Sequence, residues 1–306
     1  MIPCTVTVPA TTANLGPGFD CLGAALSLYN VFNFLPQPAD APAFALTLLN
    51  RDLPALANDS DNLLYRAFCR LYEILGKAPT PVKVEAQVEV PLARGLGSSA
   101  TAIVGGLVGA NTLAGHPLTV TEILKLAIEL EGHPDNVAPA LLGGAQLSVS
   151  GEDGLTVPLE WHPDLVPVVM IPDFELSTVA ARAVLPASYS RSDAIFNAAR
   201  LGLLIQALAQ GRGDWLTAAM EDKIHQPYRE TLIPGYAELK ATARAAGAYN
   251  LVISGAGPTL LALTSPEKAP VVVCSLESVW QDHGVQAKGL ALSLDQDGAR
   301  VTTMIS

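Results

Sequence analysis

One strand, one glycine-rich loop and one helix, in direct succession over residues 82–113, limit the folds open to this chain. Apolar residues alternate with charged or polar ones over residues 82–90, which predicts a strand with one buried and one solvated face. Residues 91–100 then read PLARGLGSSA, and small apolar residues predict a buried helix to about Leu113. Glycines allow close backbone approach to an anion, and the first turn of a helix offers it unpaired N–H groups. The segment therefore predicts a phosphate-binding loop, with a simple capped turn as the alternative.

The kind of phosphate ligand is a separate question, because the loop also fits the dinucleotide-binding pattern G-x-G-x-x-A. Glu122 lies near the position expected for a ribose-binding acid. Against this, a dinucleotide-binding fold has a strand buried on both faces before the loop, whereas residues 82–90 carry charges on one face. The chain contains no Gly-Lys-Ser or Gly-Lys-Thr, which excludes a Walker A loop. An atypical kinase loop remains, since the hydroxyls of Ser98 and Ser99 suit phosphate oxygens or a magnesium ion.

Composition narrows the class of protein further. A chain of 306 residues fits two modest domains better than one large one, and its 50% apolar content predicts compact folding. The 18 Lys and Arg against 29 Asp and Glu give a net charge of −11, which argues against nucleic-acid binding. Four scattered cysteines without zinc-ligand spacing predict reduced core thiols. The apolar run at residues 100–118 contains Asn111, His116 and Pro117, so we expect a buried helix and no membrane span. Residues 1–5 do not resemble the start of a secretion signal, so we expect a cytoplasmic protein.

Strands and helices interleave along the chain without a regular period, which favours an α+β fold over a barrel or a solenoid. The polar break at residues 150–154 predicts a domain boundary, with one domain over residues 1–153 and a second over residues 154–306. The expected strands are at residues 4–8, 26–34, 82–90, 143–149, 166–171, 250–254 and 260–264. The expected helices are at residues 63–75, 98–113, 120–131, 178–184, 192–210, 214–221 and 235–246. Residues 9–18 are expected to form a loop between the first two strands.

Three further segments could carry chemistry. Residues 129–136, ELEGHPDN, crowd carboxylates, an imidazole and an amide at a helix end, where a Glu could bind magnesium. A solvated, capped helix terminus is the alternative for this segment. Residues 11–20 present Asn14 and Asp20, which could bind an ammonium group or could belong to an ordinary turn. Residues 254–259, SGAGPT, could approach a ligand or form a tight bend.

Taken together, residues 9–20, 91–101, 131–139 and 254–259 resemble the motifs of the GHMP kinase superfamily, and within it those of the homoserine kinase family. The resemblance implies a two-domain GHMP kinase fold, with an N-terminal domain like domain 2 of ribosomal protein S5 and a ferredoxin-like C-terminal domain. It implies transfer of the ATP γ-phosphoryl group to the side-chain hydroxyl of L-homoserine, with Mg²⁺, in the cleft between the domains. The product would be O-phospho-L-homoserine, on the route to threonine. Homodimers in the family make a homodimer an expectation here too.

The resemblance also implies roles for individual residues. The expected ATP-binding residues are Pro91, Leu92, Ala93, Arg94, Gly95, Leu96, Gly97, Ser98, Ser99, Ala100 and Thr101. The expected substrate-binding residues are Asn14, Asp20, His133, Asn136, Arg182 and Arg229. Ser98 and Glu131 resemble the magnesium ligands, with Glu129 as the alternative to Glu131. An acid and an arginine fork suit the ammonium and carboxylate of a zwitterion such as homoserine.

The motifs contain no lysine, so the lysine that other superfamily members use to activate the hydroxyl has no counterpart in them. The resemblance therefore implies catalysis by positioning and charge stabilisation, with Asn136 and Arg182 as the leading contacts to the transition state. Another small-alcohol kinase of the same superfamily is the first alternative. A nucleotide-responsive binding protein without catalysis is the second, and an oxidoreductase is the last.

Overall fold

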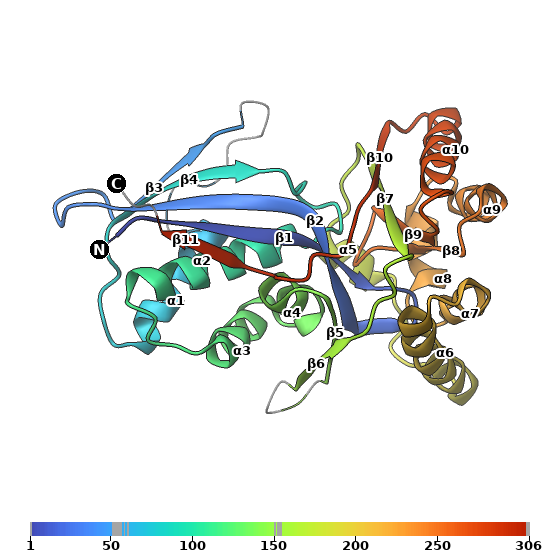
Figure 1. The fold of residues 1–306 in the computed structure, drawn as a ribbon, viewed down its shortest axis with the longest axis horizontal. Helices are drawn as coiled ribbons and strands as arrows, with labels where there is room; N and C mark the ends of the chain where they lie inside the picture. Colours follow the sequence, from blue (N-terminus) through green and yellow to red (C-terminus); the bar gives the residue numbers. More distant parts are fainter. Residues whose placement is uncertain are drawn as a thin grey trace.

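The computed structural model describes residues 2–50, 57, 59, 61–149, 151 and 155–303, and their strands form two sheets (Figure 1). The first sheet contains β1 Cys4–Asn14, β2 Gly18–Pro36, β3 Phe44–Leu48, β4 Val82–Val88, β5 Ala145–Ser148, β6 Thr156–Leu159 and β11 Arg300–Thr303. The second contains β7 Val166–Pro172, β8 Asn250–Ile253, β9 Leu260–Thr264 and β10 Ala287–Ala291. The helices are α1 Leu63–Ile74, α2 Ser98–Leu113, α3 Val120–Glu131, α4 Pro134–Leu142, α5 Thr178–Ala183, α6 Arg191–Gln210, α7 Gly213–Ala219, α8 Gln226–Arg229, α9 Tyr236–Ala246 and α10 Ala269–Asp282, with a 3₁₀ turn at Glu230–Leu232.

The first sheet has the strand order β11-β1-β2-β4-β3, with β5 paired to β2 and β6 to β5. Helices α1 to α4 cover one face of this sheet, and the other face of β4 is solvated (Figure 1). Val82, Val84, Ala86 and Val88 are buried while the residues between them are not, as the alternation in the sequence predicted.

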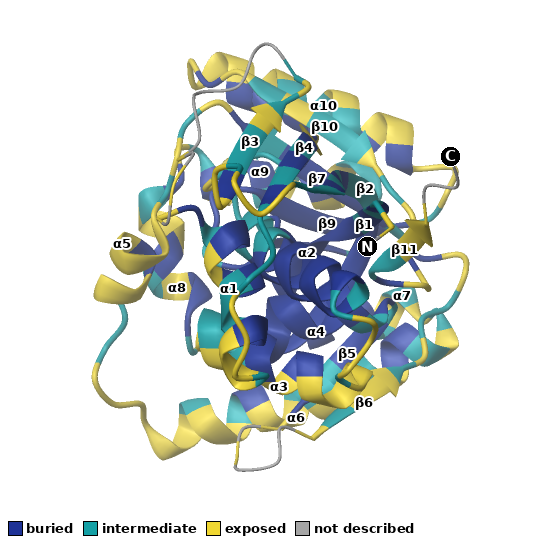
Figure 2. Ribbon diagram, turned by 90° about the vertical axis from the view of Figure 1, so that its left-hand side faces the viewer, coloured by how far each residue is buried: buried dark blue, intermediate teal, exposed yellow. Residues whose placement is uncertain are grey.

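Helix α2 lies at the centre of this layer and is buried along most of its length (Figure 2). Its glycines allow it to lie close to the sheet. A Cβ at Gly105 would be 2.6 Å from the Phe32 ring, and one at Gly109 would overlap the Phe34 ring. The spacing of Gly105 and Gly109, four residues apart, therefore allows the helix to pack closely on the sheet. No helix in the described ranges is long and apolar enough to cross a membrane.

The expected loop at residues 9–18 is mostly strand, so this prediction was wrong. β1 continues to Asn14 and β2 begins at Gly18, which leaves only residues 15–17 as a turn. Register shifts after Pro9 and after Ala13 let the long strand continue through its proline without a regular ladder. The backbone of Asn14 has a positive φ of 74°, which lets the chain reverse there.

The second sheet has the antiparallel order β10-β7-β9-β8. Two helices, α9 and α10, pack on one face around the fully buried Trp280. Helices α6 and α7 pack on the opposite face, in a cluster that also includes Leu15 of the β1–β2 turn and Leu22 and Leu26 of β2. The succession β7-α6-β8-β9-α10-β10 is that of a ferredoxin-like unit, so the predicted α+β, two-domain fold is confirmed.

Two strands of the first sheet come from the second half of the chain. β6 pairs with β5, and β11 pairs with β1 so that Thr303 lies opposite Cys4. The proposed boundary between residues 153 and 154 falls outside the described residues. The division into two domains at that point stays a prediction, and the last strand returns to the first sheet.

Candidate active site

A cleft of about 260 Å³ opens where the two sheets meet, and every residue predicted to bind substrate or metal lines it. These residues are Asn14, Asp20, Ser98, Glu131, His133, Asn136, Arg182 and Arg229. They come from the end of β1, the start of β2, the start of α2, the α3–α4 junction, α5 and α8. Residues 255–257, in the turn between β8 and β9, line the same cleft. Segments far apart in the sequence therefore meet at one place, as the resemblance implied.

The glycine-serine loop meets the cleft at the N-terminus of α2, and neighbouring segments hold its backbone. The hydroxyl of Ser254 donates to the carbonyl of Gly95 at 2.6 Å, and the Thr11 N–H donates to the carbonyl of Leu96 at 3.1 Å. Gly97 precedes the helix with a φ of 67°, in the left-handed region that favours glycine. The first N–H groups of α2 have no partner within the helix and face the cleft at Ser98 and Ser99.

Replacing Gly97 by alanine is expected to reduce both stability and ATP binding. The added Cβ would overlap Thr11 Oγ1, which donates to Asn136 Oδ1 at 2.8 Å, and the left-handed backbone would be strained. We expect a loss of about 2–4 kcal/mol in the free energy of unfolding and a raised KM for ATP. Gly76→Ala is the matched control, because Gly76 has a φ of 62° but open space around it. Denaturation curves and ATP kinetics that are the same for both variants would contradict a role for this contact.

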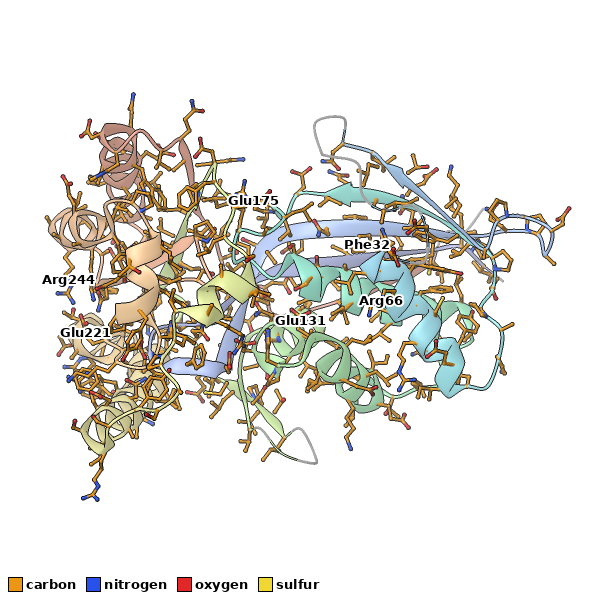
Figure 3. All side chains as sticks on the ribbon, turned by 180° about the vertical axis from the view of Figure 1, so that it is seen from behind. Phe32, Arg66, Glu131, Glu175, Glu221 and Arg244 are labelled. Atoms are coloured by element: carbon orange, nitrogen blue, oxygen red, sulfur yellow. The ribbon has the colours of Figure 1, made fainter. Side chains whose placement is uncertain are left out.

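The two glutamates at the end of α3 face different neighbours. Ser99 Oγ donates to Glu131 Oε1 at 2.6 Å, inside the cleft, and Figure 3 shows Glu131 in the middle of the molecule. Burial raises the pKa of the Glu131 carboxyl, with the Ser99 hydrogen bond acting in the opposite direction. Glu129 Oε1 lies 2.9 Å from Arg70 Nη2 of α1, on the surface. The geometry therefore favours Glu131 over Glu129 as a metal ligand.

The segment after Glu131 forms the N-terminus of α4. His133 Nδ1 lies 2.6 Å from Oδ1 of the buried Asp135, and this hydrogen bond raises the pKa of His133. Asn136 is held through its Oδ1 by Thr11, and its Nδ2 lies 3.4 Å from Asp135. The segment is both a helix terminus and a wall of the cleft, so the two interpretations of its sequence are compatible.

Arg182 of α5 and Asp20 of β2 form a bidentate ion pair at the mouth of the cleft. Nη1 lies 3.0 Å from Asp20 Oδ2 and Nη2 lies 2.8 Å from Oδ1. The Asp20 N–H donates to Asn14 Oδ1 at 3.1 Å, and Asn14 Nδ2 donates to the Gly255 carbonyl at 2.8 Å. Asn14 thus joins Asp20 to the second sheet. The hydrogen bond to Asp20 raises the pKa of Arg182, which stays charged.

Arg229 of α8 is the buried cation of the cleft, with 2% of its surface exposed. Its Nε donates to the Ala181 carbonyl at 3.1 Å, and its Nη1 donates to the Gly255 carbonyl at 2.9 Å. Burial lowers the pKa of Arg229, although a guanidinium keeps its proton. Among the described residues, no acceptor bonds to Nη2, and the side chain lines the cleft. Two N–H bonds of Arg229 are therefore open to a ligand.

Not every residue of the expected ATP motif has its side chain in the cleft. Arg94 donates from Nε to the Pro172 carbonyl at 3.0 Å and from Nη2 to the Asp173 carbonyl at 2.9 Å, at the junction with the second sheet. Leu96 and Ala100 are fully buried. For these residues the predicted ATP binding would involve the backbone.

A second cavity of about 320 Å³, with mostly apolar walls, adjoins the loop and shares Ser98 and Ser99 with the cleft. Its other lining residues are Asn30, Phe32, Leu46, Ala57, Asp61, Asn62, Leu63, Leu64, Ala86, Val88, Leu92 and Ala102. The sequence analysis missed this cavity, because its walls come from β2, β3, β4, α1 and α2, and no local motif connects them.

Known proteins of one family are similar to this chain in sequence and in fold. The family models for the GHMP kinases N terminal domain and the GHMP kinases C terminal region match residues 62–144 and 204–282. A homoserine kinase of Synechocystis sp. is 56% identical over 306 residues, covering 99% of this chain and 100% of that protein. A homoserine kinase of Picosynechococcus sp. is 58% identical over 296 residues, covering 96% of this chain and 97% of that protein. The crystal structure of homoserine kinase from Cytophaga hutchinsonii has a TM-score of 0.90 at 30% identity, covering 99% of this chain and 98% of that one.

The fold and the site define an ATP-dependent small-molecule kinase of the GHMP type. More narrowly, the chain belongs to the homoserine kinase family, and its activity is that of a homoserine kinase, in threonine biosynthesis. The predicted family and activity are confirmed, and the oxidoreductase and the non-catalytic binding protein are excluded.

Proposed function

We propose that L-homoserine binds in the cleft as a zwitterion, with its hydroxyl directed at the γ-phosphoryl group of an ATP held by residues 97–99. One observation carries this proposal: the open N-terminus of α2, the carboxylate of Asp20 and the guanidinium of Arg229 line a single cavity. A phosphoryl donor and a small zwitterion bound there would be in reach of one another. Such alignment supplies a large part of the rate enhancement in phosphoryl transfer.

Each charged end of homoserine has a matching group. Two open N–H bonds on Arg229 Nη2 suit the α-carboxylate, and a guanidinium fork gives direction as well as charge. Asp20 suits the ammonium group, and Asn14 orients the Asp20 backbone for that role. His133 lines the same cavity beside Asp135. An uncharged alcohol would leave the open N–H bonds of Arg229 Nη2 unpaired and would bring no ammonium group to Asp20, which disfavours it.

Arg182 has a different role in this proposal. Without substrate, both terminal nitrogens of Arg182 donate to the carboxylate of Asp20. An ammonium group at Asp20 would compete for that carboxylate and leave one edge of Arg182 free for the oxygens of the moving phosphoryl group. Positive charge fixed at that point stabilises the transition state more than the ground state.

ATP would extend from the second cavity into the cleft. The apolar walls suit a purine ring, and the shared Ser98 and Ser99 suit a triphosphate at the helix N-terminus. Enlarging Ala102, which lines only the second of the two cavities, is the test of this arrangement. We expect Ala102→Leu to raise the KM for ATP about tenfold and to leave the KM for homoserine unchanged. Steady-state kinetics with each substrate varied in turn measure both, and an equal rise in the two would contradict it.

Mg²⁺ would be held by Glu131 and the Ser98 hydroxyl. The described residues contain no cluster of three His, Cys, Asp or Glu side chains suited to a metal. One partly buried carboxylate beside serine hydroxyls fits Mg²⁺, which takes its other ligands from phosphates and water. When bound, the ion neutralises charge on the β- and γ-phosphates.

No lysine is among the described residues that line the cleft. Phosphoryl transfer proceeds through a loose transition state, in which the attacking hydroxyl needs alignment more than early loss of its proton. The chain's own residues would therefore act by holding the two substrates in line, with Asn136 beside the loop and Arg182 at the transferred group. Both are proposed as the catalytic contacts.

Substrate analogues test the orientation of homoserine. ADP release with Mg²⁺ would be compared for L-homoserine, 4-hydroxybutyrate, which lacks the ammonium group, and 3-amino-1-propanol, which lacks the carboxylate. We expect kcat/KM to fall by about 10² or more for each analogue, since each lacks one of the two charged groups that the site is proposed to bind. L-Serine, mevalonate and galactose serve as controls for the length and class of the acceptor. Homoserine and 4-hydroxybutyrate reacting equally well would overturn the role of Asp20.

A further inference from the structure

His225 is a fully buried histidine directly behind the cleft, and the proposed mechanism leaves it without a role. Its Nε2 lies 2.8 Å from the carbonyl oxygen of Gly16, in the turn between β1 and β2. Its Nδ1 lies 3.3 Å from Nη1 of Arg229, one helical turn further along the chain. The Phe19 ring stacks on the imidazole, with ring centroids 5.1 Å apart. The imidazole therefore lies between the segment that carries Asp20 and the arginine of the cleft.

These two contacts define the protonation of the ring. A carbonyl oxygen only accepts, so Nε2 must carry a proton, and a guanidinium only donates, so Nδ1 must be bare. Burial lowers the pKa of His225, and the nearby Arg229 acts in the same direction, while Asp222 opposes them. The geometry thus defines a neutral imidazole protonated on Nε2.

The backbone of His225 is fixed as well. The carboxylate of Asp222 accepts from the N–H groups of Ile224, His225 and Gln226, at 3.0, 2.8 and 2.7 Å. Asn197 of α6 donates to the same carboxylate at 2.6 Å. This network leaves the imidazole little freedom, because the residue is held through both its main chain and its ring.

We propose that His225 is a positioning residue for homoserine binding, which accepts from Nη1 of Arg229 and thereby directs Nη2 at the substrate carboxylate. The inference rests on the proposed role of Arg229. Arg229 Nε donates to the Ala181 carbonyl, and Nη1 contacts both the Gly255 carbonyl and His225 Nδ1. Only Nη2 is therefore open to the ligand. Through Gly16, the same ring is tied to the turn that leads to Asp20, so one side chain relates the two charged ends of the substrate site.

Two conservative variants separate positioning from simple packing. In His225→Asn the amide lies near the position of Nδ1, where its oxygen can accept from Arg229, but it does not reach Gly16. In His225→Gln the amide reaches the position of Nε2 and can donate to Gly16, but Arg229 loses its acceptor. We expect His225→Gln to raise the KM for homoserine about 30-fold, with kcat and the KM for ATP changed less than threefold. In His225→Asn we expect the KM for homoserine, the KM for ATP and kcat all to stay within fivefold of their values in the parent protein.

The acceptor 3-amino-1-propanol is a control for the two variants, because it has no carboxylate that Arg229 Nη2 could bind. Its kcat/KM is expected to be the same in His225→Gln and the parent protein. Equal effects of the two variants on homoserine, or an equal loss on both acceptors, would overturn the inference while leaving the proposed function intact. A parent enzyme that does not discriminate homoserine from 3-amino-1-propanol would overturn the role of Arg229, and the inference with it.

A measurement on the unaltered protein covers the case in which His225→Gln does not fold. Nitrogen NMR of ¹⁵N-histidine-labelled enzyme distinguishes the two neutral tautomers from the charged ring, and the chain has only five histidines. The signal absent from His225→Asn belongs to His225. A neutral ring protonated on Nε2 is the expected result. A ring protonated on Nδ1, alone or together with Nε2, has no acceptor for Arg229 and would overturn the inference.

Discussion

Glu131→Gln is expected to lower kcat by about 10³-fold, or about 4 kcal/mol of transition-state stabilisation. The substitution removes one negative charge from the cleft and keeps the size of the side chain and an oxygen that can accept from Ser99. The proposed Mg²⁺ ligand set would lose its only carboxylate, so the Mg²⁺ concentration for half-maximal activity should rise together with the fall in kcat. ADP release measured across a Mg²⁺ titration gives both quantities.

Glu129→Gln is the matched control for this variant. It makes the same change two residues earlier on the same helix, on a side chain that is 57% exposed and paired with Arg70. Exposed ion pairs contribute about 0–1 kcal/mol to stability, so kcat and the Mg²⁺ requirement should stay near those of the parent. If Glu129→Gln lost activity while Glu131→Gln kept it, the alternative glutamate would be the ligand.

Arg182→Met is expected to lower kcat by about 10²–10³-fold, with a change in the KM for ATP of less than threefold. Methionine keeps much of the aliphatic length but cannot stabilise charge on the transferred phosphoryl group. The protein should fold normally, because the ion pair with Asp20 is partly exposed. Single-turnover measurements with both substrates saturating would report the chemical step directly.

Arg191→Met provides the control for a lost surface charge, since Arg191 lies exposed at the start of α6. Arg182→Lys keeps the charge without the planar fork and should be intermediate in kcat. A selective rise in the KM for homoserine, with kcat unchanged, would contradict a transition-state role for Arg182. That result would instead assign Arg182 to ground-state binding of the substrate.

Local patterns predicted the elements that depend on nearby residues. The alternation at residues 82–90 correctly indicated the solvated face of β4, and the expected helix at residues 120–131 is α3, which begins with a capping box between Thr119 and Glu122. Charge patterning also argued correctly against a dinucleotide-binding fold. The grouping of eight expected site residues in one cleft came from the family resemblance, since nothing in local spacing relates Asn14 to Arg229.

Other features depended on contacts between distant segments and could not be predicted. Glu129 and Glu131 have similar local surroundings, and only the packing of α3 between Arg70 of α1 and Ser99 of α2 distinguishes them. Residues 9–14 resemble a loop in composition, yet pairing with β2 makes them a strand. His225 and Arg229 are four residues apart, a spacing that could have drawn attention to the pair, but their partners Gly16 and Gly255 are revealed only by the fold.

The pairing of β11 with β1 has a consequence for how the protein is made. β1 is synthesised long before β11, so the edge of the first sheet beside β1 stays open until β11 has left the ribosome. A ribosome that stopped before β11 would release a polypeptide that carries every residue lining the cleft but exposes the backbone of β1. Such a truncated product would be a template for association with other nascent chains, so β11 protects this edge of the sheet against aggregation.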